Sequence, residues 1–406
     1  MFATASGGMG GIWSMGAASF HLRCQRSELV QALGAADAVV PSTSAKPILT
    51  NLMLDAQAGG VLEIAATDLQ VGLRSVCSRV EVVHAGQVVV PARKLVSVLK
   101  ESRSHTVELT VDGGSDHPQL CIELGDGSYR LPTVVGEVFP QVTAYPDEGT
   151  VVNLPAEVLN QMIRRTVFAV DKERTSAVLS GVYLGINSDG VLMAATDGKV
   201  LSEYDHRCPT SVVGDAALNA IIPASTMGHL QRVLDAGGQG QVAIALVGKL
   251  IFVRMQLSSD PESKESIAIE LTSRCIEGTY PPYRNALPPK SQQTMVFQRD
   301  ELASAVRRTA LMTSSASPGI ILSISRGQAE LSNLFNTSGT AHIPLTCTYD
   351  GEQQRFGFNA AYLSHVLKAI GGEEVMFELN GPGRGIITRD GESTFLVMPI
   401  SLPNSP

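Results

Sequence analysis

Val89-Val90-Pro91-Ala92-Arg93-Lys94-Leu95 is the first of three related stretches in the chain. The other two are Ile221-Ile222-Pro223-Ala224-Ser225-Thr226-Met227 and Gly357-Phe358-Asn359-Ala360-Ala361-Tyr362-Leu363, at intervals of 132 and 136 residues. In each, an apolar pair, a Pro or Asn and a small residue precede an amphipathic stretch, which predicts a strand that runs into a helix. Proline suits this position because the first helical turn has no partner for its missing N–H. The regular spacing predicts an internal repeat.

Two further features return in the same order. Residues 62–68 and 192–197 are strand-like and end in Ala-Thr-Asp, with a degenerate third copy near residues 331–336. Acidic residues in the first turn of a helix, which suit the helix dipole, open each copy at Glu28, Glu157 and Asp300. Short β-rich runs separated by Gly and Asp follow the helices. We therefore predict an α+β fold of three repeated domains, each with two helices against an antiparallel sheet.

The domain limits are predicted from polar, proline-bearing segments near residues 146–149 and 288–293. They give three repeated domains over residues 20–147, 148–290 and 291–406. Residues 1–19 are small and Gly-rich without a basic region ahead of an apolar core, which argues against a secretory signal. We expect a disordered tail, or a true start further along the chain at Met9 or Met15. The six helices are predicted at residues 25–40, 91–104, 155–174, 223–237, 299–315 and 360–371.

Charge is distributed unevenly between the helices and the rest of the chain. The formal net charge is −8, yet the six predicted helices carry five more basic than acidic residues. Basic residues late in a helix also complement its dipole, so one cluster alone decides little. The segregation across all six helices favours one basic face that holds phosphates non-specifically. The residues expected on this face are Arg93, Lys94, Lys100, Arg103, Arg164, Arg165, Lys172, Arg174, Arg307 and Arg308.

Catalytic and metal-binding patterns are absent from the sequence. The residues Gly114–His117 are typical of a turn rather than a catalytic triad, and Gly381–Gly385 is typical of a hairpin rather than a phosphate-binding loop. Asp68 and Asp197 are interpreted as turn caps rather than paired carboxylates. The eight histidines show no metal spacing. We expect no catalytic residue, metal or cofactor; a metabolite enzyme on a repeated α+β scaffold remains a distant alternative.

The cysteines and the hydropathy indicate the compartment. Six cysteines are scattered along the chain without a Cys-x-x-Cys pair, which favours reduced thiols over a disulfide framework. No apolar run approaches the ~20 residues that span a bilayer. We therefore expect a cytoplasmic protein that has no membrane partner.

Together the repeats resemble the beta subunit of bacterial DNA polymerase III. The most specific stretches are Val88–Leu95, Ala195–Gly198, Ile276–Tyr283 and Leu396–Pro399, and the resemblance covers residues 20–402. It implies the DNA clamp fold, in which a head-to-tail homodimer closes into a ring with helices lining the hole. It also implies a processivity factor, a sliding clamp that encircles duplex DNA and is not an enzyme.

The resemblance further implies a hydrophobic pocket that captures short linear motifs of the Gln-Leu-x-Leu-Phe kind. The expected partners are the replicative polymerase, the clamp loader and repair proteins. The ring interface would set Tyr129 and Leu131 against Leu311 and Met312. Without the resemblance, the apolar C-terminal run alone would indicate an edge strand. By position, the pocket residues are Val178, Leu179, Thr196, Gly198, Lys199, Val200, Leu201, Pro281, Ala286, Leu396, Val397, Met398, Pro399 and Ile400.

Several residues depart from the family pattern. Relatives often carry His-Arg where Lys199 and Val200 stand, and a Met-Arg-Leu ending where this chain has residues 400–402. Ala286 replaces a bulkier apolar residue, and the charged segment 258–266 is longer than expected and predicts a solvated loop. These departures motivate an alternative function, a paralogous clamp specialised for repair or for tolerance of an inhibitor.

Overall fold

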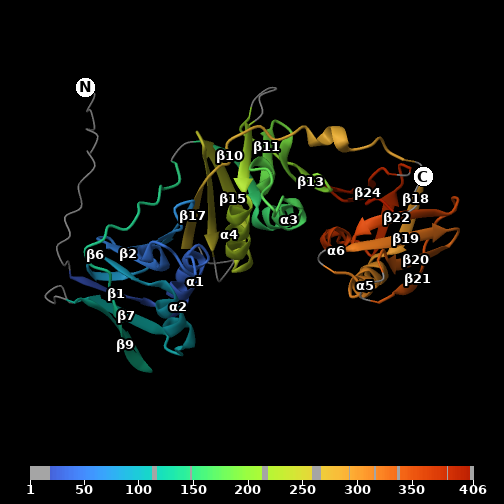
Figure 1. Cartoon of the computed structure of the whole chain (residues 1–406). Coiled ribbons are helices and arrows are strands. Elements are labelled where there is room, and N and C mark those ends of the chain that lie inside the picture. Colours follow the sequence, from blue (N-terminus) through green and yellow to red (C-terminus); the bar gives the residue numbers. More distant parts are fainter. Residues whose placement is uncertain are drawn as a thin grey trace, which may run out of the picture. The chain divides into compact units, whose positions relative to one another are not determined.

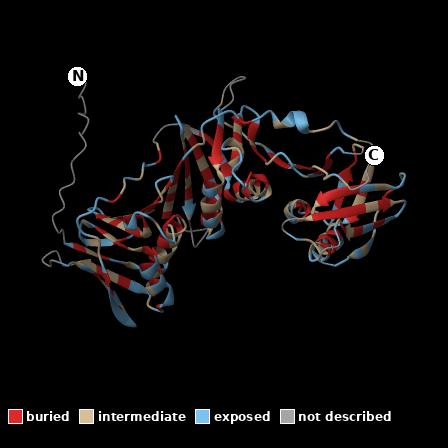
Figure 2. Ribbon diagram, in the orientation of Figure 1, coloured by how far each residue is buried: buried red, intermediate tan, exposed pale blue. Residues whose placement is uncertain are grey.

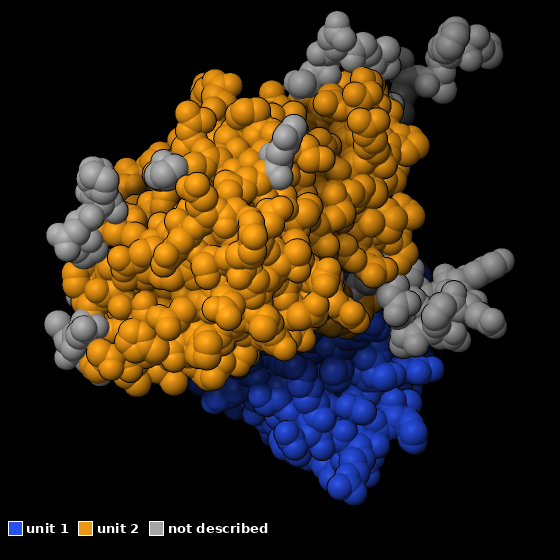
Figure 3. Space-filling view, turned by 90° about the vertical axis from the view of Figure 1, so that its right-hand side faces the viewer, with its two compact units in different colours: residues 1–144, 256–272 blue, residues 145–255, 273–406 orange. Residues whose placement is uncertain are grey.

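The structure is a computed structural model that describes residues 19–111, 117–146, 149–212, 218–257, 267–291, 293–314, 317–335, 339–381 and 383–402 (Figure 1). The predicted tail up to Ala18, the predicted loop 258–266 and residues 114–116 of the predicted turn lie outside these ranges. The chain divides into two compact units, one of residues 1–144 and 256–272 and one of residues 145–255 and 273–406 (Figure 3).

The strand-to-helix pattern is confirmed in all three repeats. Pro91 and Pro223 end a strand and precede a helix, as does Asn359, whose side chain accepts a hydrogen bond from Ala361 N at 2.9 Å. These three residues also stand at equivalent places in their sheets, paired with Asn51, Gly181 and Gly319. The elements are β6 (Gly86–Pro91) and α2 (Ala92–Glu101), β14 (Leu218–Pro223) and α4 (Ala224–Asp235), and β22 (Gln354–Asn359) and α6 (Ala360–Ala369).

The other three predicted helices are also present, as α1 (Arg26–Asp37), α3 (Ala156–Thr166) and α5 (Arg299–Ala310). Each repeat packs its two helices together, α1 with α2, α3 with α4 and α5 with α6.

The predicted C-terminal ends of several helices were wrong. The helix predicted over residues 155–174 ends at Thr166 and continues only as the short 3-10 helix η2 (Val167–Ala169). Asp171 then accepts hydrogen bonds from Glu173 N, Thr175 Oγ1 and Ser176 N, which stabilise a turn in place of a further helical turn. Arg174 in this turn has φ of 55°.

Unit 1 contains a five-stranded sheet in the order β5-β1-β7-β8-β9. Its other strands, β4, β3, β2 and β6, are hydrogen-bonded to one another in that order. Residues 267–272 of β17 (Ile267–Arg274) lie next to β4, where Arg74 pairs with Glu63 at 2.6 Å and with Glu270 at 2.8 Å. The bounds are β1 (Phe20–Gln25), β2 (Asn51–Gln57), β3 (Val61–Thr67), β4 (Val71–Cys77), β5 (Glu81–His84), β7 (Thr106–Val111), β8 (Gln119–Leu124) and β9 (Gly127–Pro132).

Unit 2 contains an eight-stranded sheet in the order β14-β11-β12-β13-β25-β24-β23-β18. It also holds the sheet β21-β20-β19-β22 and the neighbours β10, β15 and β16. The bounds are β10 (Thr150–Pro155), β11 (Gly181–Asn187), β12 (Gly190–Thr196), β13 (Val200–Arg207), β15 (Gly238–Val247), β16 (Leu250–Leu257), β18 (Thr294–Gln298), β19 (Gly319–Ser325), β20 (Gln328–Asn333), β21 (His342–Thr346), β23 (Glu374–Glu378), β24 (Ile386–Asp390) and β25 (Ser393–Val397).

One strand pair joins the second and third repeats. β13 of the second repeat pairs antiparallel with β25 of the third, so both repeats share one sheet and one compact unit. The predicted domain limits at residues 147 and 290 fall just before β10 and β18, and they remain a prediction.

Burial follows the amphipathic pattern of the sequence. α2 buries Ala92, Leu95, Val96 and Leu99, the spacing of one helical face, and leaves its basic residues on the other. Figure 2 shows buried residues running along the strands of both units.

Candidate functional site

The floor of the predicted peptide pocket lies on three adjacent strands of unit 2. Leu201 on β13 pairs with Leu396 on β25, and Leu396 pairs in turn with Ile387 on β24. These three side chains are buried, with exposed fractions of 3%, 3% and 0%. Leu201 comes from the second repeat and the other two from the third. Strand pairing between the repeats therefore builds the floor.

Half-buried apolar side chains surround this floor. Tyr283, Leu287 and Met398 pack against it. Met398 is among the pocket residues predicted from the sequence, whereas Tyr283, Leu287 and Ile387 are not. Tyr283 and Leu287 flank the predicted Ala286, so a wider window on that segment would have included them. Ile387 had no such signal, because only the sheet register brings it beside Leu396.

The turn that carries Gly198 and Lys199 is held by its own side chains. Thr196 Oγ1 donates to Val200 O at 2.7 Å and accepts from Gly198 N at 3.0 Å. Asp197 Oδ1 accepts from Lys199 N and Val200 N at 2.8 Å. Val200 is buried and Lys199 is exposed. These hydrogen bonds fix the turn, in which Gly198 and Lys199 are exposed to solvent.

The same turn recurs in the first repeat. Thr67 Oγ1 donates to Val71 O at 2.8 Å, and Asp68 Oδ1 accepts from Gln70 N and Val71 N at 2.9 and 2.7 Å. The interpretation of Asp68 and Asp197 as turn caps is therefore confirmed.

The remaining predicted pocket residues come from three segments. Val178 and Leu179 are half-buried in the 3-10 helix η3 (Val178–Ser180), and Asp171 N donates to Leu179 O at 2.8 Å. Pro281 and Ala286 are exposed on the segment that contains the 3-10 helix η4 (Tyr283–Ala286).

The C-terminal segment divides between two places. Val397 is buried and paired with Val200, and Met398 N donates to Lys199 O at 2.8 Å. After Pro399 the chain leaves β25 and reaches β22 of the same repeat, where Ile400 N donates to Gly357 O at 2.8 Å. A Cβ added to Gly357 or Gly319 would lie within 3 Å of the Ile400 side chain. Ile400 is thus packed on glycines of the third repeat.

Nine of the ten basic residues predicted to face DNA are exposed, and Arg165 is not. Arg93, Lys94 and Lys100 lie on α2, whereas Arg103 follows it. Arg307 and Arg308 lie in the last turn of α5. Lys172 and Arg174, predicted to be helical, lie instead in the turn after α3. Arg164 on α3 pairs with Asp235 of α4 at 2.7 Å.

Arg165 is directed into the junction of the second and third repeats. Its Nη1 lies 3.1 Å from Asp390 Oδ2 and donates to Ser393 Oγ at 3.0 Å, and its guanidinium is 5.8 Å from the centre of the Tyr204 ring. Its side chain is only 18% exposed. These contacts assign Arg165 a structural role between α3 and the β24–β25 hairpin.

The four predicted interface residues differ in exposure. Tyr129 on β9 is 44% exposed, but Leu131 on the same strand is 7% exposed and belongs to the core of unit 1. Leu311, directly after α5, is 74% exposed, and Met312 is half-buried. The Met312 sulfur lies near Gly339.

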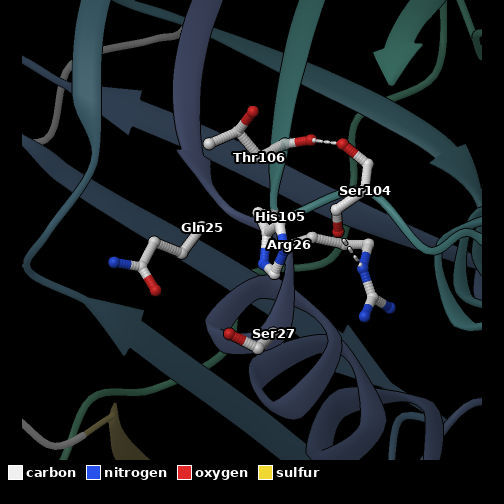
Figure 4. Close-up of a pocket in the computed structure, with 6 residues that line it drawn as sticks. All are labelled: Gln25, Arg26, Ser27, Ser104, His105 and Thr106. Carbon is white, nitrogen blue, oxygen red and sulfur yellow. Dashed lines mark hydrogen bonds between the residues drawn. The ribbon is translucent and has the colours of Figure 1, made fainter. Parts of the chain in front are cut away.

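Two cavities lie away from the predicted pocket. One of 270 Å³ lies at the start of α1, between Gln25, Arg26 and Ser27 and the facing residues 104–106 (Figure 4). Its arginine is engaged by the fold, since Arg26 donates to Ser104 O at 2.7 Å and to Leu99 O at 2.8 Å. The other, of 1140 Å³, is an open groove between α5 and the strands β19 to β21.

In the described ranges, no cluster of three or more His, Cys, Asp or Glu side chains has the geometry of a metal site. Among the helices that the structure describes, none is long and apolar enough to cross a membrane.

The Gly381–Gly385 segment connects β23 and β24, which pair antiparallel; Pro382 lies outside the described residues. Its interpretation as a hairpin connection is confirmed.

Three family models match the chain one after another. They are the N-terminal, central and C-terminal domains of the DNA polymerase III beta subunit, matched at residues 20–143, 153–282 and 284–401. The chain belongs to the DNA polymerase III beta subunit family. Its function is that of a processivity factor, the sliding clamp of DNA replication, and it is not an enzyme. Family membership overturns the distant alternative of a metabolite enzyme.

Similar proteins agree along nearly the whole chain. The beta sliding clamp of Caulobacter vibrioides is 27% identical over 374 residues, covering 91% of this chain and 95% of that protein. The beta sliding clamp of Pseudomonas putida is 26% identical over 385 residues, covering 94% and 100%. The crystal structure of the DNA polymerase III subunit beta from Pseudomonas aeruginosa is 26% identical, covers 94% and 100%, and has a TM-score of 0.80.

A second solved structure is also similar along nearly the whole chain. It is the sliding clamp from Pseudomonas aeruginosa bound to griselimycin, 26% identical, with a TM-score of 0.81 and coverage of 95% and 100%. The agreement in fold confirms the predicted clamp architecture of three repeated α+β domains.

Proposed function

We propose that this clamp works in the cytoplasm as a head-to-tail homodimer that encircles duplex DNA and tethers partner proteins through the pocket of unit 2. The partners are the replicative polymerase, the clamp loader and repair proteins. The observation that carries the proposal is the apolar floor of Leu201, Ile387 and Leu396, which both repeats contribute.

The chemistry of this floor suits a short linear motif. Leu and Phe anchors would bury their side chains against the three floor residues and against Tyr283, Leu287 and Met398. Burying one such side chain contributes about 1.5–3 kcal/mol. A few anchors of this kind carry most of the affinity of a peptide in an apolar groove.

The basic helical residues support sequence-independent DNA contact. The exposed side chains on α2, α3 and α5 would meet phosphates through contacts that salt weakens. Enclosure by the ring then replaces affinity, so weak contacts permit sliding while the clamp remains on DNA.

Closure of the ring needs an interface on each protomer. The 74% exposed Leu311 and the 44% exposed Tyr129 are apolar groups that a partner protomer would cover. Leu131 would support this surface from within unit 1. Such a head-to-tail contact closes when the rotation per protomer is right for a ring of two.

A labelled peptide containing Gln-Leu-Ser-Leu-Phe tests the pocket by fluorescence anisotropy. Met398→Asp places a carboxylate against the apolar floor and should abolish saturable binding. Met376→Asp is the matched control, because Met376 is 46% exposed on β23. A folded, dimeric wild-type protein that fails to bind would overturn the pocket assignment.

A second candidate is a clamp specialised for repair or inhibitor tolerance. It is favoured by Val200, which is buried, and by the packed Ile400 with the ending Ser401-Leu402. A second, more typical clamp gene in the same genome, combined with weak binding of the peptide above, would favour this candidate. Strong binding and no second gene would remove it.

A further inference from the structure

A buried carboxylate lies beside the pocket floor. Glu203 follows Leu201 by two residues on β13, so both side chains lie on the same face of the sheet. The Glu203 side chain is 10% exposed. Its Oε2 accepts hydrogen bonds from Tyr283 Oη at 2.6 Å and from Arg284 Nε at 2.8 Å. A carboxylate buried to this extent requires such partners.

The two donors belong to a segment that is mostly exposed. Pro281, Pro282, Arg284 and Ala286 are exposed around the four-residue helix η4. A helix of this length has little stability of its own, so side-chain contacts must fix its position. The hydrogen bonds from Tyr283 and Arg284 to Glu203 fix η4 to β13, next to the floor.

Tyr283 itself forms part of the pocket wall. Its ring packs against the floor and lies 6.1 Å from the Tyr280 ring and 6.2 Å from the Tyr183 ring, in edge-on geometry. Tyr280 Oη in turn accepts from Thr196 N at 3.0 Å. Tyr283 therefore contacts the floor, and Tyr280 connects its ring to Thr196 at the start of the turn.

The protonation states keep this arrangement in place. Burial, and then the hydrogen bond to Glu203, raise the pKa of Tyr283, so its hydroxyl remains a donor at neutral pH. The hydrogen bond to Glu203 likewise raises the pKa of Arg284.

We propose that Glu203 is a positioning residue of the pocket, which holds the Tyr283 ring and η4 where they form the wall and thereby sets the affinity for partner motifs. The inference rests on the proposed function of this pocket. Glu203 does not touch the motif; it acts through Tyr283. A purely structural contribution would change stability, whereas positioning changes motif affinity in a folded protein.

The test uses the full-length protein and the labelled Gln-Leu-Ser-Leu-Phe peptide. Glu203→Leu removes both hydrogen bonds and should weaken binding about tenfold, the loss expected for a hydrogen bond to a charged group. Glu203→Gln keeps an acceptor and should lose less, and Tyr283→Phe keeps the ring but loses the donor. Circular dichroism melts show that each variant is folded at the binding temperature.

A double-mutant cycle separates positioning from charge. If Glu203 acts through Tyr283, the variant with both Glu203→Gln and Tyr283→Phe should bind no worse than Tyr283→Phe alone. Asp205→Asn is the matched control, since Asp205 lies on the same strand and contacts Arg284 at 3.2 Å but is 55% exposed. It should leave the affinity unchanged.

Three outcomes would overturn the inference while the pocket assignment stands. They are wild-type affinity in a folded Glu203→Leu variant, additive losses in the cycle, and an equal loss in Asp205→Asn. Absence of binding by the wild-type protein would instead overturn both the inference and the proposed pocket.

Discussion

Tyr362 on α6 donates a hydrogen bond to Asp197 Oδ2 at 2.6 Å, which joins the third repeat to the turn at residues 196–200. The other carboxylate oxygen of Asp197 accepts from Lys199 N and Val200 N. One side chain therefore both shapes the turn beside the pocket and attaches it to a helix 165 residues away in sequence.

Tyr362→Phe should weaken binding of the labelled peptide about threefold to tenfold, because the turn loses a hydrogen bond to a charged group. Tyr349→Phe is the control: its hydroxyl donates to Glu352 O at 2.8 Å, away from the pocket. We expect it to lower the melting temperature without changing peptide affinity. Equal affinity losses in both variants would contradict a specific role for Tyr362.

Arg164 and Arg165 are neighbours in sequence with different expected effects on stability. Arg165→Ala removes the contacts with Asp390 and Ser393 from a largely buried site and should lower the free energy of unfolding by about 1.5–3 kcal/mol. Arg164→Ala removes a pair in which both partners are more than 40% exposed, worth at most about 1 kcal/mol. Urea denaturation of the full-length protein, followed through the unfolding of unit 2, measures the free energy of unfolding of both variants. Equal losses would contradict the assignment of Arg165 to the repeat junction.

DNA retention should depend on the exposed face of α2. The variant with Arg93→Glu and Lys94→Glu should leave circular DNA faster than the wild type, with a shallower dependence on salt because fewer phosphates are neutralised. Arg207→Glu with Lys290→Glu gives the same change in net charge at exposed positions outside the helices. Retention times of loaded clamps measure the effect. Unchanged retention in the helical variant would count against a basic lining.

Much of the fold could be predicted because it depends on local signals. Pro91 and Pro223 mark helix starts, and the spacing of Leu95, Val96 and Leu99 marks a buried face. The direction of an individual side chain is not a local signal. Nothing near Arg165 in sequence distinguishes it from Arg164; its direction follows from Asp390, which a strand pairing between repeats brings close.

The same reason explains the missed site residues. Ile387 and Glu203 acquire their places only through the register of β13, β25 and β24 and through the path of the segment at residues 281–287. The resemblance to the family indicated the segments of the proposed pocket. It did not indicate that the buried carboxylate of Glu203 accepts a hydrogen bond from Tyr283.

Stability at mildly acidic pH should depend on His365. Its Nδ1 is buried and has no hydrogen-bond partner among the residues that the structure describes, and its ring lies 5.7 Å from Phe168. Burial, then Lys172 and Lys368, lower its pKa. The unfolded chain therefore takes up this proton first, so the contribution to stability is complete above the ordinary value of 6.5 and is lost as pH falls toward the folded pKa.

Replacing the histidine tests this pH dependence. In His365→Phe the ring contact with Phe168 is kept and the titration is removed. The fall in melting temperature between pH ~7.5 and ~5.5 should be smaller than in the wild type. An identical fall in both proteins would show that other groups account for the acid sensitivity.

Gly385→Ala should damage the pocket more than the fold. A Cβ at this position would overlap Leu396 Cδ1 and lie 3.0 Å from Met398 Sδ. The tip of the Leu396 side chain can move, so the strain is relieved by displacing a floor residue rather than the backbone. Peptide affinity should therefore fall at least about tenfold while the melting temperature changes by a few degrees. Gly228→Ala is the control, because no described residue lies within 4 Å of its added Cβ on α4. There alanine should slightly stabilise the helix and leave binding unchanged; a Gly385→Ala protein that binds normally would mean that the floor residue Leu396 does not contact the motif.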